Sequence, residues 1–289
     1  MSSEQVQNIW SSLKLVAPFG CFPIRWVKGK PVFWGGPSMT IFILTWLSFV
    51  LLVAVNESIC PNHNDPCSLV FVINFYANML IIVNFITLFV NRERLVAGLS
   101  SITKTHRIVC RVPIKVPLHF NVYIVLSLFA FFGVVIFLAD QRYEFIKTLH
   151  LMWYYVKINC ICFIPIVFCI LLEIAGQCFS AMEQQLLLVD ESDRPRLIVA
   201  LVAVYDKLVD DSMVLNRCFA MQIMLVLILY VSIIITNLFE FISGSFTTVR
   251  LQAMFIMFAA KVQQFASLIF VFSTCESVTD KVSMSLYDG

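Results

Sequence analysis

The sequence predicts an all-α membrane protein, a single polytopic helix bundle over residues 1–289 with six spans. Apolar residues make up 60% of the chain and charged residues only 13%, whereas soluble domains average about 45–50% apolar and about 25% charged. Six stretches approach or exceed the roughly 20 apolar residues that a bilayer crossing needs. Lysine and arginine are concentrated in alternate connecting segments, as the positive-inside rule requires.

The six expected spans cover residues 39–55, 69–90, 120–139, 152–172, 218–239 and 251–275. With the N-terminus inside, fifteen of the 20 Lys and Arg residues lie in the cytosolic segments, which are 1–38, 91–119, 173–217 and 276–289. Three lie in the outer loops, and Lys157 and Lys261 fall within spans. This asymmetry predicts that both the N-terminus and the C-terminus are cytosolic.

The outer loop after the first span contains two candidate modifications. Cys60 and Cys67 bracket the short segment Cys-Pro-Asn-His-Asn-Asp-Pro-Cys, and a disulfide between them would persist outside the cell; two free thiols are the alternative. His63 with two cysteines is a poor zinc signature, so we expect no metal. Asn56 begins an Asn-Glu-Ser glycosylation sequon, although its place at the end of a span disfavours modification.

Residues 173–217 predict a long helical hairpin that projects into the cytosol between the fourth and fifth spans. Residues 177–189 continue the helical pattern of the fourth span, and 190–195 form a polar turn. From residue 194, apolar and charged residues alternate at helical spacing and then give way to an uncharged run that ends near 239. Because no Pro or Gly separates the two halves, we expect one helix, amphipathic in water and apolar in lipid.

Polar side chains within the second span are candidate ligand contacts. Polar groups in lipid are costly and usually face protein or water. Asn74 and Asn78 are four residues apart and therefore share one face of a helix. They either line a ligand pocket or form hydrogen bonds between helices.

Two lysines within spans extend the candidate ligand site. Lys157, next to Tyr154 and Tyr155, lies near the outer end of the fourth span. It either extends outward to the headgroups or faces a cavity. Lys261 lies near mid-membrane with Gln264 close behind it, where a lysine requires water or a cavity. We therefore expect Tyr154, Lys157, Lys261 and Gln264 to contact a ligand.

The chain carries no signature of common catalytic chemistry. A Gly-Lys-Ser/Thr phosphate loop, a His-Glu-x-x-His zinc motif and a Gly-x-Ser-x-Gly nucleophile motif are all absent. The four His residues are scattered, and the net charge of +2 gives no indication of nucleic-acid binding. We expect no enzyme, no cofactor and no nucleic-acid partner, which leaves transport, conduction or sensing.

Residues 201–219 resemble a segment of the insect gustatory receptor family. There a leucine-rich stretch with a late Asn and an aromatic residue precedes the fifth span, and the matching residues here include Asn216 and Phe219. The segment 19–23, Phe-Gly-Cys-Phe-Pro, is also similar to that family. The cytosolic N-terminus, short outer loops and long second cytosolic loop extend the resemblance over nearly the whole chain.

The resemblance implies a plasma-membrane taste receptor, a ligand-gated cation channel that binds small tastants and assembles as a tetramer of like or unlike subunits. It implies subunit contacts through the cytosolic helices, with Leu201, Tyr205, Leu208 and Leu215 as candidates. The family ends in a seventh, pore-lining span, whereas residues 275–289 here form a polar tail. We therefore expect a chain truncated before that span, which puts conduction by this chain alone in doubt.

Two other membrane classes stay open. Residues 140–143, Asp-Gln-Arg-Tyr, are similar to the Asp-Arg-Tyr motif of G-protein-coupled receptors, but the extra Gln departs from it and the charge pattern places Arg142 outside. A secondary transporter would use paired repeats and helices broken near the midplane. Here only Gly133 and Pro165 interrupt the spans.

Overall fold

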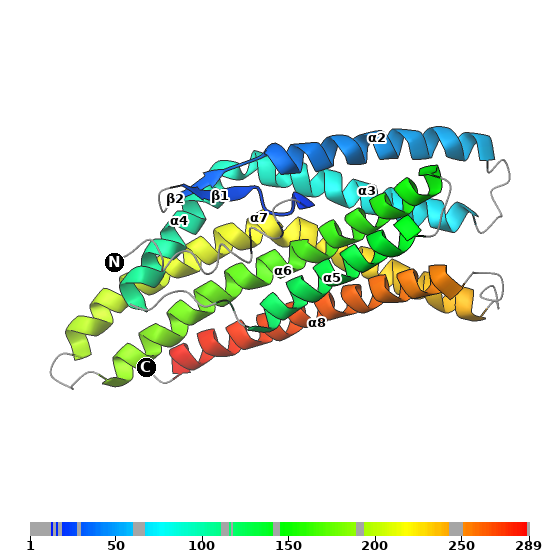
Figure 1. Ribbon diagram of the computed structural model, residues 1–289. Helices are drawn as coiled ribbons and strands as arrows, with labels where there is room; N and C mark the ends of the chain where they lie inside the picture. The colour runs from blue at the N-terminus through cyan, green and yellow to red at the C-terminus, as the bar shows by residue number, and fades with distance from the viewer. Residues whose placement is uncertain are drawn as a thin grey trace.

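The computed structural model is an elongated bundle of long helices (Figure 1). It describes residues 13, 16, 19–27, 30–59, 67–110, 116, 118–140, 145–188, 194–242 and 251–287. The helical class is confirmed. In chain order, the elements are β1 (Ile24–Val27), β2 (Lys30–Phe33), α2 (Gly36–Ile59), α3 (Cys67–Val90), α4 (Arg92–Val109), α5 (Leu118–Asp140), α6 (Phe145–Leu188), α7 (Arg194–Ile242) and α8 (Leu251–Tyr287).

Each expected span lies within one helix, namely α2, α3, α5, α6, α7 or α8. Among the described residues, two stretches are long and apolar enough to cross a membrane, Val156–Leu188 in α6 and Arg196–Ile235 in α7. Shorter apolar stretches cover Phe75–Val90 and Leu118–Ala130. These lengths weakly indicate a membrane protein, because a buried helix of a soluble protein can meet the same criteria. The six-span count and the direction of the termini stay predictions.

Large apolar side chains lie on the outer surface of the bundle. Leu51 of α2, Phe129 of α5, Ile235 of α7 and Ile269 of α8 each expose 62–73% of their surface. A soluble monomer rarely exposes extended apolar patches. Lipid would cover this surface without the hydration penalty that water imposes.

Helix α6 forms the centre of the molecule. It packs against α3, α4, α5, α7 and α8, and every residue from 157 to 171 is buried. Pro165 lies inside α6 without ending it. Because most of the other helices contact α6, its side chains are the ones best placed to join polar groups from several helices.

The predicted hairpin of two long helices is confirmed within the described residues. Helix α7 is continuous over 49 residues, and α6 over 44. The C-terminal end of α6 and the N-terminal end of α7 lie together at one end of the bundle (Figure 1). The polar turn expected at 190–195 falls largely outside the described residues.

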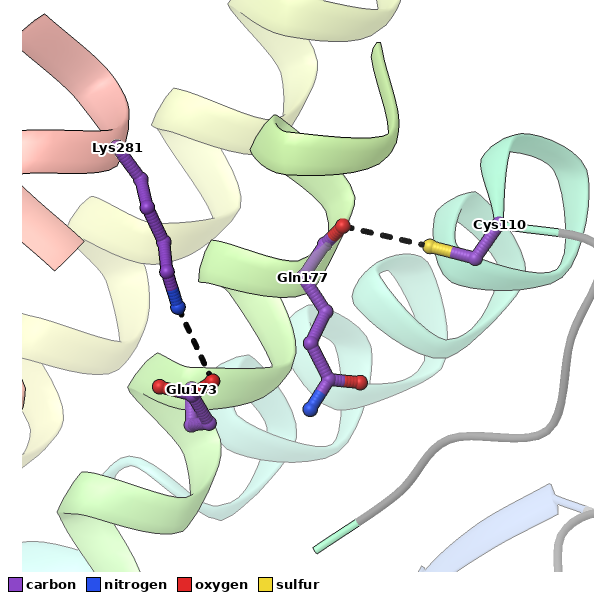
Figure 2. Close-up of polar contacts among 4 residues, drawn as sticks. All are labelled: Cys110, Glu173, Gln177 and Lys281. Carbon is purple, nitrogen blue, oxygen red and sulfur yellow. Dashed lines mark hydrogen bonds and ion pairs between the residues drawn. The ribbon is translucent and has the colours of Figure 1, made fainter. Parts of the chain in front are cut away.

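The C-terminal segment is a helix, which the sequence analysis did not predict for residues 276–289. Helix α8 continues to Tyr287 and lies along α6. A Cβ added to Gly176 of α6 would lie 3.3 Å from Val278 Cγ2, so this glycine permits the close approach. Lys281 Nζ forms a salt bridge with Glu173 Oε1 at 3.1 Å (Figure 2).

A small β-hairpin departs from the purely helical prediction. β1 and β2 pair antiparallel, with Ile24 opposite Phe33 and Val27 opposite Lys30. The main-chain N–H of Trp34 donates to the Pro23 carbonyl at 2.7 Å and extends the pairing. The short α4 between spans was expected only as a cytosolic segment, and its first turns pack against β2.

Candidate functional site

A hydrogen-bonded polar cluster lies inside the apolar bundle where α5, α6 and α8 meet. Gln263 Nε2 of α8 donates to Asn159 Oδ1 of α6 at 2.9 Å. The Tyr123 hydroxyl of α5 donates to the main-chain oxygen of Gln263 at 3.0 Å. All three side chains are buried. A single residue of α8 is therefore held by two other helices.

A second polar pair adds α7 to this cluster. The hydroxyl oxygens of Tyr230 in α7 and Ser267 in α8 lie 2.7 Å apart. The Ser267 hydroxyl also donates to the Gln264 carbonyl at 2.8 Å, and the geometry of the Tyr230–Ser267 pair allows either hydroxyl to be its donor. Cys162 Sγ of α6 lies 3.6 Å from the same Tyr230 hydroxyl. Four helices thus contribute to one polar region.

A small pocket lies between α7 and α8 beside this cluster. Its volume is about 20 Å³, which suffices for one water and falls far below the roughly 300 Å³ of a small-ligand pocket. The pocket is mainly apolar with three polar groups, and its lining residues are Tyr230, Ile233, Ile234, Lys261, Gln264, Phe265 and Leu268. In this conformation it does not hold a molecule larger than water.

The predicted ligand-contact residues lie in different parts of the bundle. Lys261 and Gln264 line the pocket together. Lys157 is 97% buried in α6, with 3% of its surface exposed, so it faces the bundle rather than extending to the headgroups. Asn78 of α3 is also buried, and its amide has no hydrogen-bond partner among the described residues. The structure therefore joins only two of the predicted residues.

Five other predicted sites cannot be placed, because their side chains lie outside the described residues. Asn56 belongs to the last turn of α2, Cys67 and Asn74 to α3, and Tyr154 to α6. Cys60 falls in the segment 60–66, which lies outside the described ranges altogether. The disulfide, the glycosylation and the two ligand contacts stay predictions.

The four predicted subunit contacts of α7 pack within the chain. Leu208 and Leu215 have almost no exposed surface, and Leu201 is also buried. The Tyr205 ring lies 5.4 Å from the Phe179 ring of α6. Intrachain packing accounts for the apolar character of this face, and its contact with another subunit stays a prediction.

The segment 19–23, which resembles gustatory receptors, has a structural role. Gly20 has φ +71°, a conformation that favours glycine, and its carbonyl accepts from Ser38 Oγ at 2.8 Å. Phe19 packs on Phe163 of α6, with ring centroids 5.1 Å apart. The segment therefore anchors the start of α2 to the centre of the bundle.

None of the side chains that form the polar cluster is among the predicted ligand contacts; these side chains are Tyr123, Asn159, Tyr230, Gln263 and Ser267. Each hydroxyl lies in an otherwise apolar helix, and each residue type is common in membrane helices. One spacing carried a signal, because Gln263 and Ser267 are four residues apart and share one face of a helix. That face is the one that meets α6 and α7.

Cys110 is a chemically distinctive group that directly follows α4 and is not a member of this cluster. When protonated, it donates to the Gln177 main-chain oxygen of α6 at 3.6 Å (Figure 2). A hydrogen bond from Cys178, aided by His106 and opposed by burial, lowers the pKa of Cys110 from 9.0 to about 5. We therefore expect a larger thiolate fraction at neutral pH than an ordinary cysteine has.

Comparisons with known proteins identify no family for this chain. No protein-family model matches the chain, and no curated protein matches it either. Within the described ranges, no three His, Cys, Asp or Glu side chains are grouped so as to hold a metal ion. The most distinctive functional feature is therefore the polar cluster inside the bundle.

Proposed function

We propose that this chain is a gustatory-receptor-like subunit of a ligand-gated cation channel that responds to small taste compounds at the plasma membrane. The observation that carries the proposal is the buried polar cluster shared by α5, α6, α7 and α8. Polar groups inside a membrane bundle are costly, and they commonly face a ligand, an ion pathway or another helix. A ligand that competes for these hydrogen bonds favours a different arrangement of the four helices.

The proposed topology has six spans with both termini in the cytosol. The concentration of Lys and Arg in alternate segments supports it. The C-terminal end of α8, the paired ends of α6 and α7, and α4 gather toward one end of the bundle (Figure 1). A bundle of this topology would place the same segments together on the cytosolic side.

The proposed ligand site is the pocket between α7 and α8 in an expanded form. Gln264 offers a hydrogen-bonding amide, while Ile233 and Phe265 offer apolar contacts. A small molecule with one polar group matches this lining. Because the volume is only about 20 Å³, binding requires α7 and α8 to separate, and that separation is the proposed link to gating.

The test measures tastant-evoked current in cells that express this chain, alone and with other gustatory receptor subunits, while uptake of labelled tastant is followed in parallel. We expect current without uptake. Gln264→Leu should raise the tastant concentration needed for half-maximal current, whereas Phe272→Leu, on the exposed face of α8, should not.

Three outcomes would reject the proposal in different ways. Tastant uptake would indicate a secondary transporter, and a response abolished by blocking G proteins would indicate a G-protein-coupled receptor. Absence of current with every partner, with the chain shown at the cell surface, would exclude a channel subunit for the compounds tested.

A further inference from the structure

A groove of about 550 Å³ lies between strand β2 and one face of α4. Its volume falls within the roughly 300–1,000 Å³ that small-molecule sites occupy. Polar groups come from both walls, and among the lining residues are Lys30, Val32, Arg92, Glu93, Val96 and Ser100. Neither the polar cluster nor the proposed tastant pocket includes this groove.

The two cations of the groove are available to an anion. Neither Lys30 nor Arg92 forms a salt bridge with any described residue, including Glu93 in the same wall. The Arg92 guanidinium is held over the Phe89 ring at 4.6 Å. Phe33 packs against the same ring at 6.0 Å, which joins the two walls.

Apolar and aromatic side chains border these cations. Val90 at the end of α3 exposes 73% of its surface, and Val32 and Trp34 on the hairpin side expose 39% and 40%. In the proposed topology this border is the level where the lipid-facing surface of α3 meets the cytosol, the level at which Trp is enriched. Cations beside exposed apolar groups match a phosphate that carries acyl chains.

We propose that this groove binds the phosphorylated headgroup of an anionic phospholipid from the cytosolic leaflet. The phosphate lies between Lys30 and Arg92, the Ser100 hydroxyl is available to donate a hydrogen bond, and the acyl chains follow the exposed surface at Val90. The inference rests on the proposed membrane orientation but not on any tastant. Lipid bound here connects the β-hairpin to α4 and stabilises their contact.

The test uses the full chain in phosphatidylcholine nanodiscs with and without phosphatidylinositol bisphosphate, and measures bound lipid by native mass spectrometry and by titration. Lys30→Gln with Arg92→Gln should weaken binding about thirtyfold if each cation contributes as basic residues near a membrane usually do. The matched control is Lys104→Gln with Arg107→Gln, a pair exposed on α4 outside the groove, and it should retain the affinity.

A second variant tests the groove without a change of charge. Ala97 is exposed and lines the groove, so Ala97→Trp should block the headgroup and reproduce the loss. Unchanged affinity in both groove variants, or equal losses in the control pair, would overturn the proposal. The thermal unfolding midpoint without lipid identifies any variant that fails to fold, and the other variant then decides.

Soluble inositol trisphosphate, added to the chain in detergent, distinguishes a lipid headgroup from a free phosphate compound as the ligand of the groove. We expect it to bind much more weakly than the lipid, because it lacks acyl chains. Equal affinity would assign the groove to a free phosphate and overturn the lipid proposal. Nanodiscs present lipid on both faces, so this assay is independent of orientation and of tastant-evoked current, and its failure is distinct from failure of the proposed function.

Discussion

Gln263 and Asn159 form a buried amide pair whose contribution to stability depends on both partners. Asn159→Leu leaves Gln263 Nε2 without its acceptor, and an unpaired buried polar group is costly. We expect the single variant to lose about 1 kcal/mol of unfolding free energy. The double variant Asn159→Leu with Gln263→Leu should recover much of that loss, because two apolar groups replace the pair.

Thermal unfolding in detergent, measured over the full double-mutant cycle, gives the coupling between the two residues. Tyr123→Phe provides a comparison, since it removes the hydroxyl that donates to the Gln263 main chain and leaves the amide pair in place. If the losses of the two single Leu variants simply add in the double variant, the pair does not act as a unit.

The Cys110 thiol gives a prediction about pH. The thiolate is the reactive form, and the pKa of Cys110 is lowered to about 5, so we expect the thiolate to persist below neutral pH. Alkylation by iodoacetamide should change little between about pH 8 and about pH 6, whereas a cysteine with an ordinary pKa near 8.5 slows about tenfold per pH unit.

Peptide mass spectrometry after timed alkylation measures this rate at Cys110 alone. Cys178→Ala removes the hydrogen bond that contributes most to the lowered pKa, so it should restore a steep dependence on pH. A tenfold slope already present in the unaltered chain would show that Cys110 is an ordinary thiol.

At the scale of the elements, we expect the C-terminal part of α8 to depend on Gly176 of α6 more than on the Lys281–Glu173 salt bridge. The Cβ added by Gly176→Val would lie within about 3.5 Å of side-chain atoms of Val278 and Lys281, and the two methyl groups need further space. We therefore expect this part of α8 to separate from α6. Lys281→Ala should have a small effect, since part-exposed ion pairs contribute about 0–1 kcal/mol.

Limited proteolysis of residues 276–287 distinguishes these two variants. Cleavage should be rapid in Gly176→Val and near the original rate in Lys281→Ala, with the unfolding midpoint of the remaining bundle little changed in both. Equal protection in the two variants would indicate that side chains along the rest of the α6–α8 contact hold this segment without the glycine.

Periodicity predicted the long elements of this fold, and it failed where local composition is ambiguous. The continuity of α7 could be predicted because 194–239 keeps helical spacing without an internal break. The β-hairpin could not, since 24–33 mixes Lys and Arg with apolar residues and its pairing depends on contact with α4. The tail after 275 is polar, and the sequence gives no sign that Val278 and Lys281 pack against Gly176 of α6.

At the scale of the whole molecule, the candidate site depends on contacts that no single helix reveals. Lys261 and Gln264 could be selected from the sequence because polar residues are rare in apolar runs. Tyr123, Tyr230 and Ser267 join them only because α5, α7 and α8 meet beside α6. Sequence patterns do not show which helices are neighbours or the depth at which they meet.

The exposed apolar surface has two parts with different expected partners. In the proposed topology, lipid covers the part around the expected spans. On the N-terminal half of α7, which the proposed topology places in the cytosol, Ile198, Val199 and Val202 expose 43%, 74% and 51% of their surface. Apolar patches in water indicate a protein partner, so in the tetramer that the family resemblance implies, this face of α7 is the better candidate for the subunit contact.

Val199→Asp with Val202→Asp should therefore abolish oligomers while the chain still inserts in the membrane. Leu208→Asp should instead destabilise the fold, because Leu208 has no exposed surface and a charge there is buried without a partner. Lys207→Asp introduces the same side chain on an exposed polar position of α7 and serves as the control. Crosslinking and native mass spectrometry in detergent measure assembly. Oligomers that survive the double substitution would show that the α7 face contacts no second subunit.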